Sequence, residues 1–155
     1  MYWPKPGTKS DPVLRWNRPD RIFFGYGACH VLAGVYLDMQ PLWEFYAERI
    51  VPNEGYSGNH VYVTDGAIAF DFHGYSGRER LLAHHWRGWS KRYPGWNATI
   101  KRVDFDLLDT AALNARKMLG PDQYLHDPLQ RARGFLSRKD HKLASERAMR
   151  TVSLS

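Results

Sequence analysis

The chain has 155 residues and a formal net charge of +6, from 22 basic and 16 acidic side chains. Its hydrophobic fraction of 43% and aromatic fraction of 14% are typical of a globular protein and exclude a disordered chain. No run approaches the roughly 18 apolar residues of a membrane span, and no secretory signal follows Met1. We therefore expect one domain over residues 1–155, cytoplasmic or exported without a cleaved signal peptide.

The two ends of the chain differ in composition from its centre. Residues 1–20 contain four prolines and few periodic apolar positions, which predicts an extended arm lying on the domain. Residues 138–155 are polar and basic, which predicts a helical tail. The positive charge of that tail would attract an acidic protein partner.

The first strongly apolar segment runs from Ala28 to Met39. Apolar residues recur in it at helical spacing and its other faces are nearly as apolar, which predicts a central buried helix. Pro41 should end that helix and begin a second one over residues 42–51. A loop over residues 53–59 follows.

Two short apolar runs on either side of Asp65-Gly66 predict a β-hairpin. Counting outward from a two-residue turn places His60 opposite Asp71, and alternation puts both on one face. Small residues on that face would leave room for the Cys29 helix. The opposite, apolar face would hold Val61, Val63, Ile68 and Phe70.

The rest of the chain predicts helices around one more strand. In chain order these are a helix over 76–93, a strand over 97–105, a helix ending near Leu119 and a helix starting at Pro128. The predicted fold class is α+β, with the central buried helix packed on a small antiparallel sheet.

Cys29 is the only cysteine, which excludes an internal disulfide and any zinc site built from cysteines. A lone cysteine is usually a small buried apolar residue. Here, however, it stands at a predicted helix start, where the thiol pKa falls. His60 could take its proton and Asp71 could orient the imidazole, as nucleophilic catalysis requires.

A cysteine at the start of a buried helix, followed by histidine and aspartate on neighbouring strands, resembles the papain-like superfamily. That group includes cysteine peptidases, cell-wall amidases and endopeptidases, transglutaminases and arylamine acetyltransferases. The resemblance covers roughly residues 22–75 and implies a papain-like fold. It implies Cys29 as nucleophile, His60 as base and Asp71 as orienting acid. The expected reaction is hydrolysis of a peptide or other amide through a thioester, with no metal or organic cofactor.

The sequence departs from the papain pattern at two positions. Phe23 stands where papain-type peptidases keep a glutamine, and His30 stands where a tryptophan commonly follows the nucleophile. The second oxyanion donor is therefore open. The candidates for that donor and for the rim of the cleft are Tyr26, Asn17, Asn59 and Tyr56.

Two other functions compete with the triad. His60, Asp71 and His73 would share a face if the second strand continued, a set that suits zinc or non-haem iron. Residues 84–96 interleave basic and aromatic side chains, as nucleic-acid binding requires. At helical spacing, however, the aromatic residues of that segment predict a core-facing stripe. The sequence therefore favours a peptide or amide substrate over nucleic acid.

Overall fold

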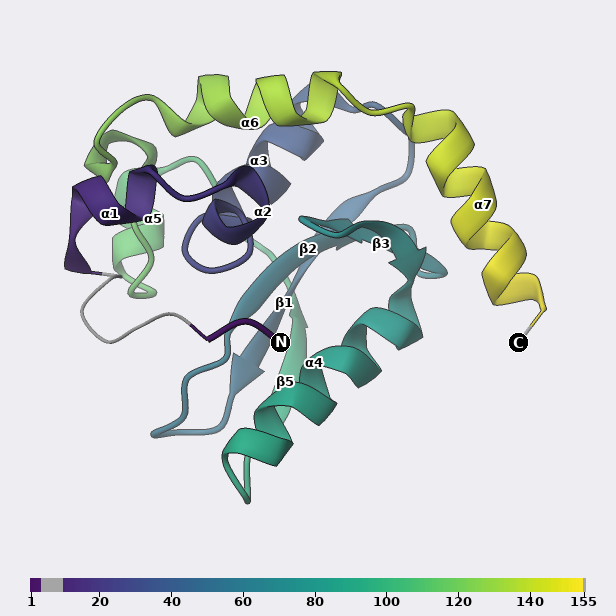
Figure 1. Ribbon diagram of the computed structural model, residues 1–155, viewed down its shortest axis with the longest axis horizontal. Helices are drawn as coiled ribbons and strands as arrows, with labels where there is room; N and C mark the ends of the chain where they lie inside the picture. The colour runs from purple at the N-terminus through teal and green to yellow at the C-terminus, as the bar shows by residue number, and fades with distance from the viewer. Residues whose placement is uncertain (4–9, 155) are drawn as a thin grey trace.

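The computed structural model describes residues 1–3 and 10–154 (Figure 1). Its helices are α1 (Pro12–Trp16), α2 (Asp20–Phe23), α3 (Cys29–Met39), α4 (Arg78–Arg92), α5 (Thr110–Asn114), α6 (Pro128–Ser137) and α7 (His141–Ser153), with a 3-10 turn at Pro121–Gln123. Its strands are β1 (Tyr46–Pro52), β2 (His60–Thr64), β3 (Ile68–Asp71), β4 (Gly74–Gly77) and β5 (Ala98–Arg102). Within this part of the chain, no helix is long and apolar enough to cross a membrane.

The strands form one antiparallel sheet in the order β4-β3-β2-β1-β5, so the predicted α+β class with a small antiparallel sheet is confirmed. Helices α3 and α6 lie on one side of this sheet and α4 lies on the other (Figure 1). Each side has its own apolar cluster. The larger cluster, between α3, α6 and the sheet, positions the start of α3 at one end of β2.

Helix α3 is central and buried, as its composition predicts, with seven of its eleven residues buried. It ends at Gln40, whose left-handed φ of 49° turns the chain before Pro41. The face on which it packs differs from the expectation. Helix α3 contacts the side of β2 that carries Val61 and Val63. The side with Tyr62 and the small Ala69 is covered by α4 instead.

The helix predicted over residues 42–51 is wrong, because this segment forms β1. Three of its residues, Tyr46, Ile50 and Val51, are aromatic or β-branched and fit a pleated surface well. The strand is also paired along both edges, with β2 on one side and β5 on the other. Those two ladders satisfy its backbone groups, which outweighs the local signal from Pro41.

The hairpin between β2 and β3 exists, but its register differs from the prediction by two residues. Val63 pairs with Phe70 and Thr64 with Ala69, where a two-residue turn would have paired Val63 with Ile68. The Asp65 carboxylate causes the wider turn, because it accepts hydrogen bonds from the backbone N–H groups of Ala67 and Ile68, each at 2.9 Å. Since side chains alternate with a period of two, this shift leaves His60 and Asp71 on the same face.

Other predicted helices are present with different bounds. Helix α4 begins at Arg78 rather than residue 76, because Ser76 is paired in β4. The helix expected to reach Leu119 stops at Asn114. Helix α6 begins at Pro128 as predicted.

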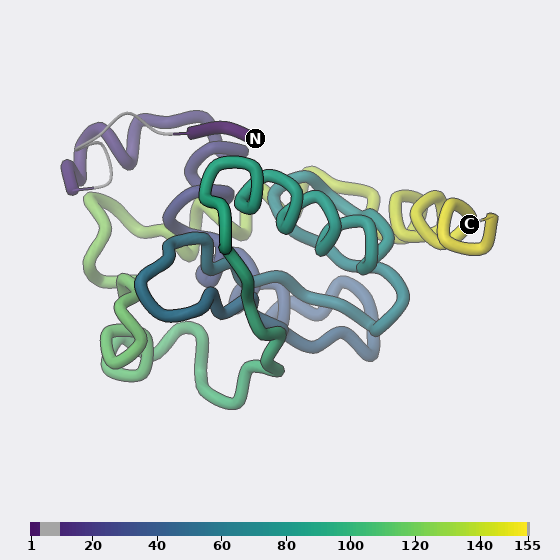
Figure 2. Tube along the Cα trace, turned by 90° about the horizontal axis from the view of Figure 1, so that it is seen from below, coloured from purple at the N-terminus to yellow at the C-terminus, as the bar shows by residue number. Residues whose placement is uncertain are grey.

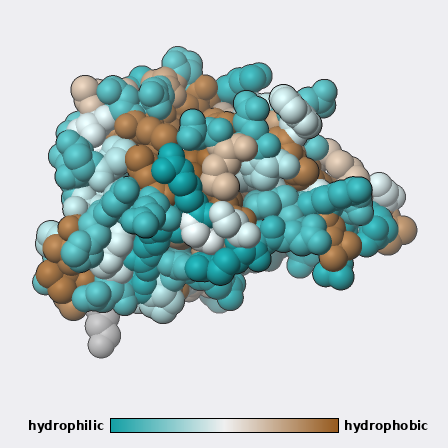
Figure 3. Space-filling view, turned by 90° about the horizontal axis from the view of Figure 1, so that it is seen from above, coloured by the Kyte–Doolittle hydropathy of each residue, from teal (hydrophilic) through white to brown (hydrophobic). Residues whose placement is uncertain are grey.

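The two ends of the chain differ in how well they match the prediction. The arm expected to be extended contains the short helix α1 and the start of α2, and its residues 4–9 lie outside the described part. The tail is helical over α7, as predicted, and projects from the body at the C-terminus (Figure 2). On the α6 and α7 side the surface is largely hydrophilic, interrupted by apolar groups (Figure 3).

Candidate active site

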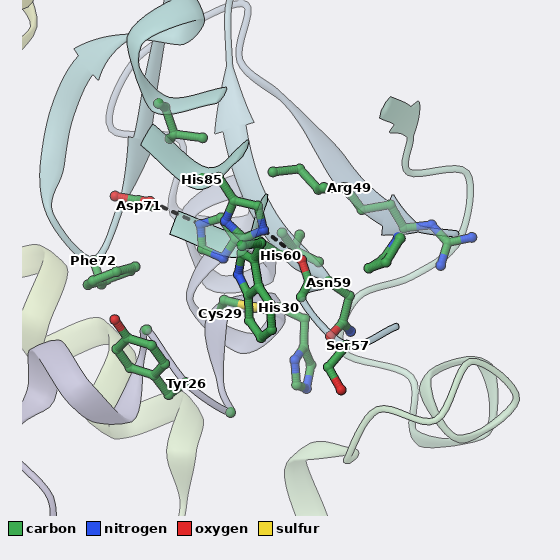
Figure 4. Close-up of a pocket in the computed structure, with 18 of the residues that line it drawn as sticks. Tyr26, Cys29, His30, Arg49, Ser57, Asn59, His60, Asp71, Phe72 and His85 are labelled. Atoms are coloured by element: carbon green, nitrogen blue, oxygen red, sulfur yellow. Dashed lines mark hydrogen bonds and ion pairs between the residues drawn. The ribbon is translucent and has the colours of Figure 1, made fainter. Parts of the chain in front are cut away.

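Cys29 is the first residue of α3, and its partly exposed side chain faces a cavity of about 1000 Å³ (Figure 4). No side chain caps this helix, so the positive end of its dipole lies beside the thiol. The backbone before Cys29 packs closely against its neighbours at Gly25. A Cβ atom there would lie 2.7 Å from the Arg21 carbonyl oxygen and 3.0 Å from the Phe72 ring. A glycine is needed for the chain to pass so closely beneath the cavity.

His60 and Asp71 form a buried hydrogen-bonded pair. The Nε2 atom of His60 lies 2.9 Å from Oδ2 of Asp71, and the two residues are 4% and 5% exposed. The second carboxylate oxygen, Oδ1, accepts the backbone N–H of His73 at 2.9 Å. Both oxygens of Asp71 are therefore engaged, which fixes the carboxylate and leaves Nδ1 of His60 for another partner.

The Cys29 thiol forms a hydrogen bond with His60, although α3 packs on the opposite face of β2 from His60. Cys29 begins α3 and His60 begins β2, and both starts lie at the same end of the sheet. Burial raises the pKa of the Cys29 thiol, but hydrogen bonds and positive charge from His30 and His60 outweigh it. The pKa falls to about 5.

The histidine responds in the opposite direction. Burial lowers the pKa of His60, but hydrogen bonds to Asp71 and to Cys29, and the charges of both groups, raise it to about 10. Burial raises the pKa of Asp71, and the hydrogen bond and charge of His60 lower it to a greater extent. The three groups thus favour a thiolate, an imidazolium and a carboxylate at neutral pH.

Two further histidines contact the triad, and the sequence pattern predicted this role for neither of them. His85 of α4 stacks on His60, with ring centroids 5.6 Å apart and planes 13° apart. Burial, and then the charge of His60, lower the pKa of His85 to about 4, so its neutral ring donates from Nε2 to the Gly58 carbonyl at 2.6 Å. His30 donates from Nε2 to the Leu119 carbonyl at 2.7 Å. Only the placement of α4 on the His60 face could have pointed to His85.

Comparison with protein-family models, with curated proteins and with solved structures finds no significant match to this chain. The papain-like resemblance therefore stays a prediction that rests on the order of Cys29, His60 and Asp71. What the structure adds is their arrangement in space, which does not depend on any relative.

Not all of the residues predicted as a second oxyanion donor or as part of the cleft rim lie at the cavity. Tyr26, Asn59 and Tyr56 all line the cavity. The Tyr26 hydroxyl accepts the Tyr2 backbone N–H at 3.0 Å, and its proton is free of that bond. Asn17 caps the C-terminus of α1 and is not among the residues that line the cavity, so the structure does not bring it to the site.

The alternative metal set is not assembled. Strand β3 ends at Asp71, and His73 lies in the tight turn to β4, so its side chain does not continue the strand face. Its Nδ1 atom lies 3.7 Å from the Asp71 oxygen that faces away from His60. Within the described part of the chain, no group of three or more histidine, cysteine or acidic side chains is arranged to hold a metal ion.

The segment over residues 84–96 supports the core interpretation of its aromatic residues. Trp86 and Trp89 pack against the buried Trp96 in the smaller apolar cluster. The indole N–H of Trp96, in the turn that follows α4, donates to the Ser57 carbonyl at 2.7 Å and so joins this turn to the loop before β2. Trp96 is buried, and Trp86 and Trp89 bury part of their surface against it, as the predicted core-facing stripe implies.

Proposed function

We propose that this protein is a cysteine-dependent acyl transferase, most simply an amide hydrolase, that uses Cys29, His60 and Asp71. The observation that carries the proposal is the buried His60–Asp71 pair at 2.9 Å beside the Cys29 thiol, which opens into a cavity. Structural cysteines in apolar surroundings have raised pKa values. A thiol with a lowered pKa at the base of a cavity is instead typical of a nucleophile.

The geometry supports a two-step reaction. The Cys29 thiolate attacks the substrate carbonyl and forms a carbon–sulfur bond, and the imidazolium of His60 gives its proton to the leaving nitrogen as the carbon–nitrogen bond breaks. Water then enters and His60 takes one of its protons while the hydroxyl attacks the thioester. The carbon–sulfur bond breaks, the acid is released, and the thiolate–imidazolium pair is restored.

The negative oxygen that forms in each step needs hydrogen-bond donors. The first-turn backbone N–H groups of α3 have no partner within the helix and lie beside the thiol, so they supply one such donor. Tyr26 and Asn59 supply candidates for the second from opposite sides of the cavity (Figure 4). Asp71 holds the imidazole in the orientation that directs Nδ1 to Cys29.

The proposal is tested with a panel of peptide arylamides that differ residue by residue, incubated with the protein and quenched in acid. We expect the wild-type protein to release the arylamine and to carry a transient acyl mass on Cys29. The Cys29→Ala variant should do neither, because the covalent intermediate needs the sulfur. Turnover that persists in Cys29→Ala, or an acyl group on another residue, would contradict the proposal.

A further inference from the structure

The cavity around Cys29 is lined by an excess of positive charge. Its basic lining residues in the described part of the chain are Arg15, Arg49, Arg80, Arg116 and Lys117. Asp71 is the one acidic residue among the lining residues, and its carboxylate is already paired with His60. A cavity with this imbalance concentrates anions, and low-dielectric walls strengthen the effect.

Two of these basic side chains, Arg49 and Arg116, lie over the same aromatic ring, that of Phe105. The guanidinium carbon of Arg116 lies 3.7 Å from the centroid of the Phe105 ring, and that of Arg49 lies 5.5 Å from the same centroid. Burial and the positive charge of Arg116 lower the pKa of Arg49, whereas the charge of Asp104 raises it. Within the described residues, neither arginine forms an ion pair with a carboxylate. Two like charges thus lie over one ring, and among the described residues no carboxylate forms an ion pair with either of them.

We propose that Arg49 and Arg116 form an anion subsite that binds a carboxylate of the acyl substrate. This inference rests on the proposed function and narrows its substrates to peptides with an acidic side chain or a free carboxylate near the reacting amide. A carboxylate would relieve the repulsion between the two guanidinium groups and accept hydrogen bonds from both.

The position of the subsite in the cavity supports a peptide rather than a nucleic acid. In the close-up, Arg49 lies on the side of Ser57 and Asn59, with Tyr26 and Phe72 on the other side of Cys29 (Figure 4). The thiol therefore lies between Arg49 on one side and the Tyr26 and Phe72 rings on the other, so a short extended chain across Cys29 would meet both. A nucleic acid would need aromatic rings open for stacking. Trp96 is buried, and Trp89, which lines the cavity, is partly buried against it.

The test uses chloroacetyl tripeptide amides, which alkylate Cys29 and place side chains in the cavity. One glutamate stands at the first, second or third position, and each peptide has a glutamine counterpart of the same shape. We expect at least one glutamate peptide to label Cys29 about tenfold faster than its counterpart, because charge-assisted hydrogen bonds are stronger than neutral ones. The extent of labelling is measured over time by mass spectrometry of the intact protein.

Variants assign the preference to the subsite. Arg49→Met combined with Arg116→Met should remove the preference for glutamate, and the matching pair of lysine substitutions should keep part of it. Arg150→Met, an exposed charge on α7 away from the cavity, serves as the matched control and should leave the ratio unchanged. No preference at any position, or a preference that survives the double methionine variant, would overturn the subsite.

The experiment separates this subsite from the triad. At about pH 9 even an unactivated thiol is alkylated, so the glutamate preference is measurable whether or not Cys29 is a catalytic nucleophile. A preference for glutamate peptides without arylamide turnover would contradict the proposed function and leave the subsite standing. Arylamide turnover without a preference for glutamate peptides would contradict the subsite and leave the proposed function standing. Protection of Cys29 by a single-stranded oligonucleotide that exceeds protection by an acidic peptide would also overturn the carboxylate assignment.

Discussion

In a His60→Ala variant, the pKa of the Cys29 thiol is expected to rise above its value of about 5 towards that of an ordinary thiol. The imidazolium that stabilises the thiolate is gone, while the burial that opposes ionisation remains. His30 also forms a hydrogen bond with the thiol, so His30→Ala should raise the pKa of Cys29 as well.

The measurement is the rate of Cys29 alkylation by iodoacetamide as a function of pH. The wild-type rate should reach its plateau near about pH 6, whereas the His60→Ala rate should still rise with pH above about pH 7. Because a thiolate of higher pKa is intrinsically more nucleophilic, the variant should be slower at low pH and equal or faster at high pH. Identical profiles in the two proteins would show that His60 does not activate Cys29.

Replacing Asp71 by asparagine is expected to lower arylamide turnover by a factor on the order of 10²–10⁴, as loss of the orienting carboxylate does in other triads. Asparagine keeps the size of the side chain but presents no negative charge to Nε2 of His60. The imidazolium is then less stable, so the pKa of Cys29 should rise as well. Turnover with a panel substrate and the alkylation profile give the two readouts. Unchanged values of both would remove Asp71 from the site.

The same variant tests the stability that the Asp71 pair provides. Because the pKa of Asp71 is lowered in the folded state, its contribution is present above the unfolded pKa of about 3.9 and is lost as the pH falls through the lower folded value. The difference in free energy of urea unfolding between wild type and Asp71→Asn should therefore be small at the acid end, grow as the pH rises from the folded pKa of Asp71 to about 4, and level off above that. A difference that stays the same from the acid end to neutral pH would contradict the low pKa.

The residues of the candidate triad could be named from the sequence because period-two alternation tolerates an error in the turn. The Asp65 turn is wider than a two-residue turn, yet the even shift kept His60 and Asp71 on one face. An odd shift would have separated them. The buried helix that begins at Cys29 followed from local composition alone, since its faces are apolar all round.

What could not be predicted depends on tertiary contacts. Strand β1 reads locally as a helix between two prolines, and only its pairing with β2 and β5 makes it a strand. The face on which α3 packs is set by α4 occupying the other one. The stacking of His85 on His60 and the meeting of Arg49 and Arg116 at Phe105 join residues far apart in the chain, which periodicity does not report.

In the resting protein, Cys29 and His60 should exist as a thiolate–imidazolium pair. The measurement to make is the ultraviolet absorbance of the thiolate, taken as the difference between wild type and Cys29→Ala during a pH titration. The structure predicts a thiolate that appears with a midpoint of about 5 and is fully formed at neutral pH. A midpoint near the ordinary thiol value of about 8.5 would show that Cys29 is a packing residue and would contradict the account.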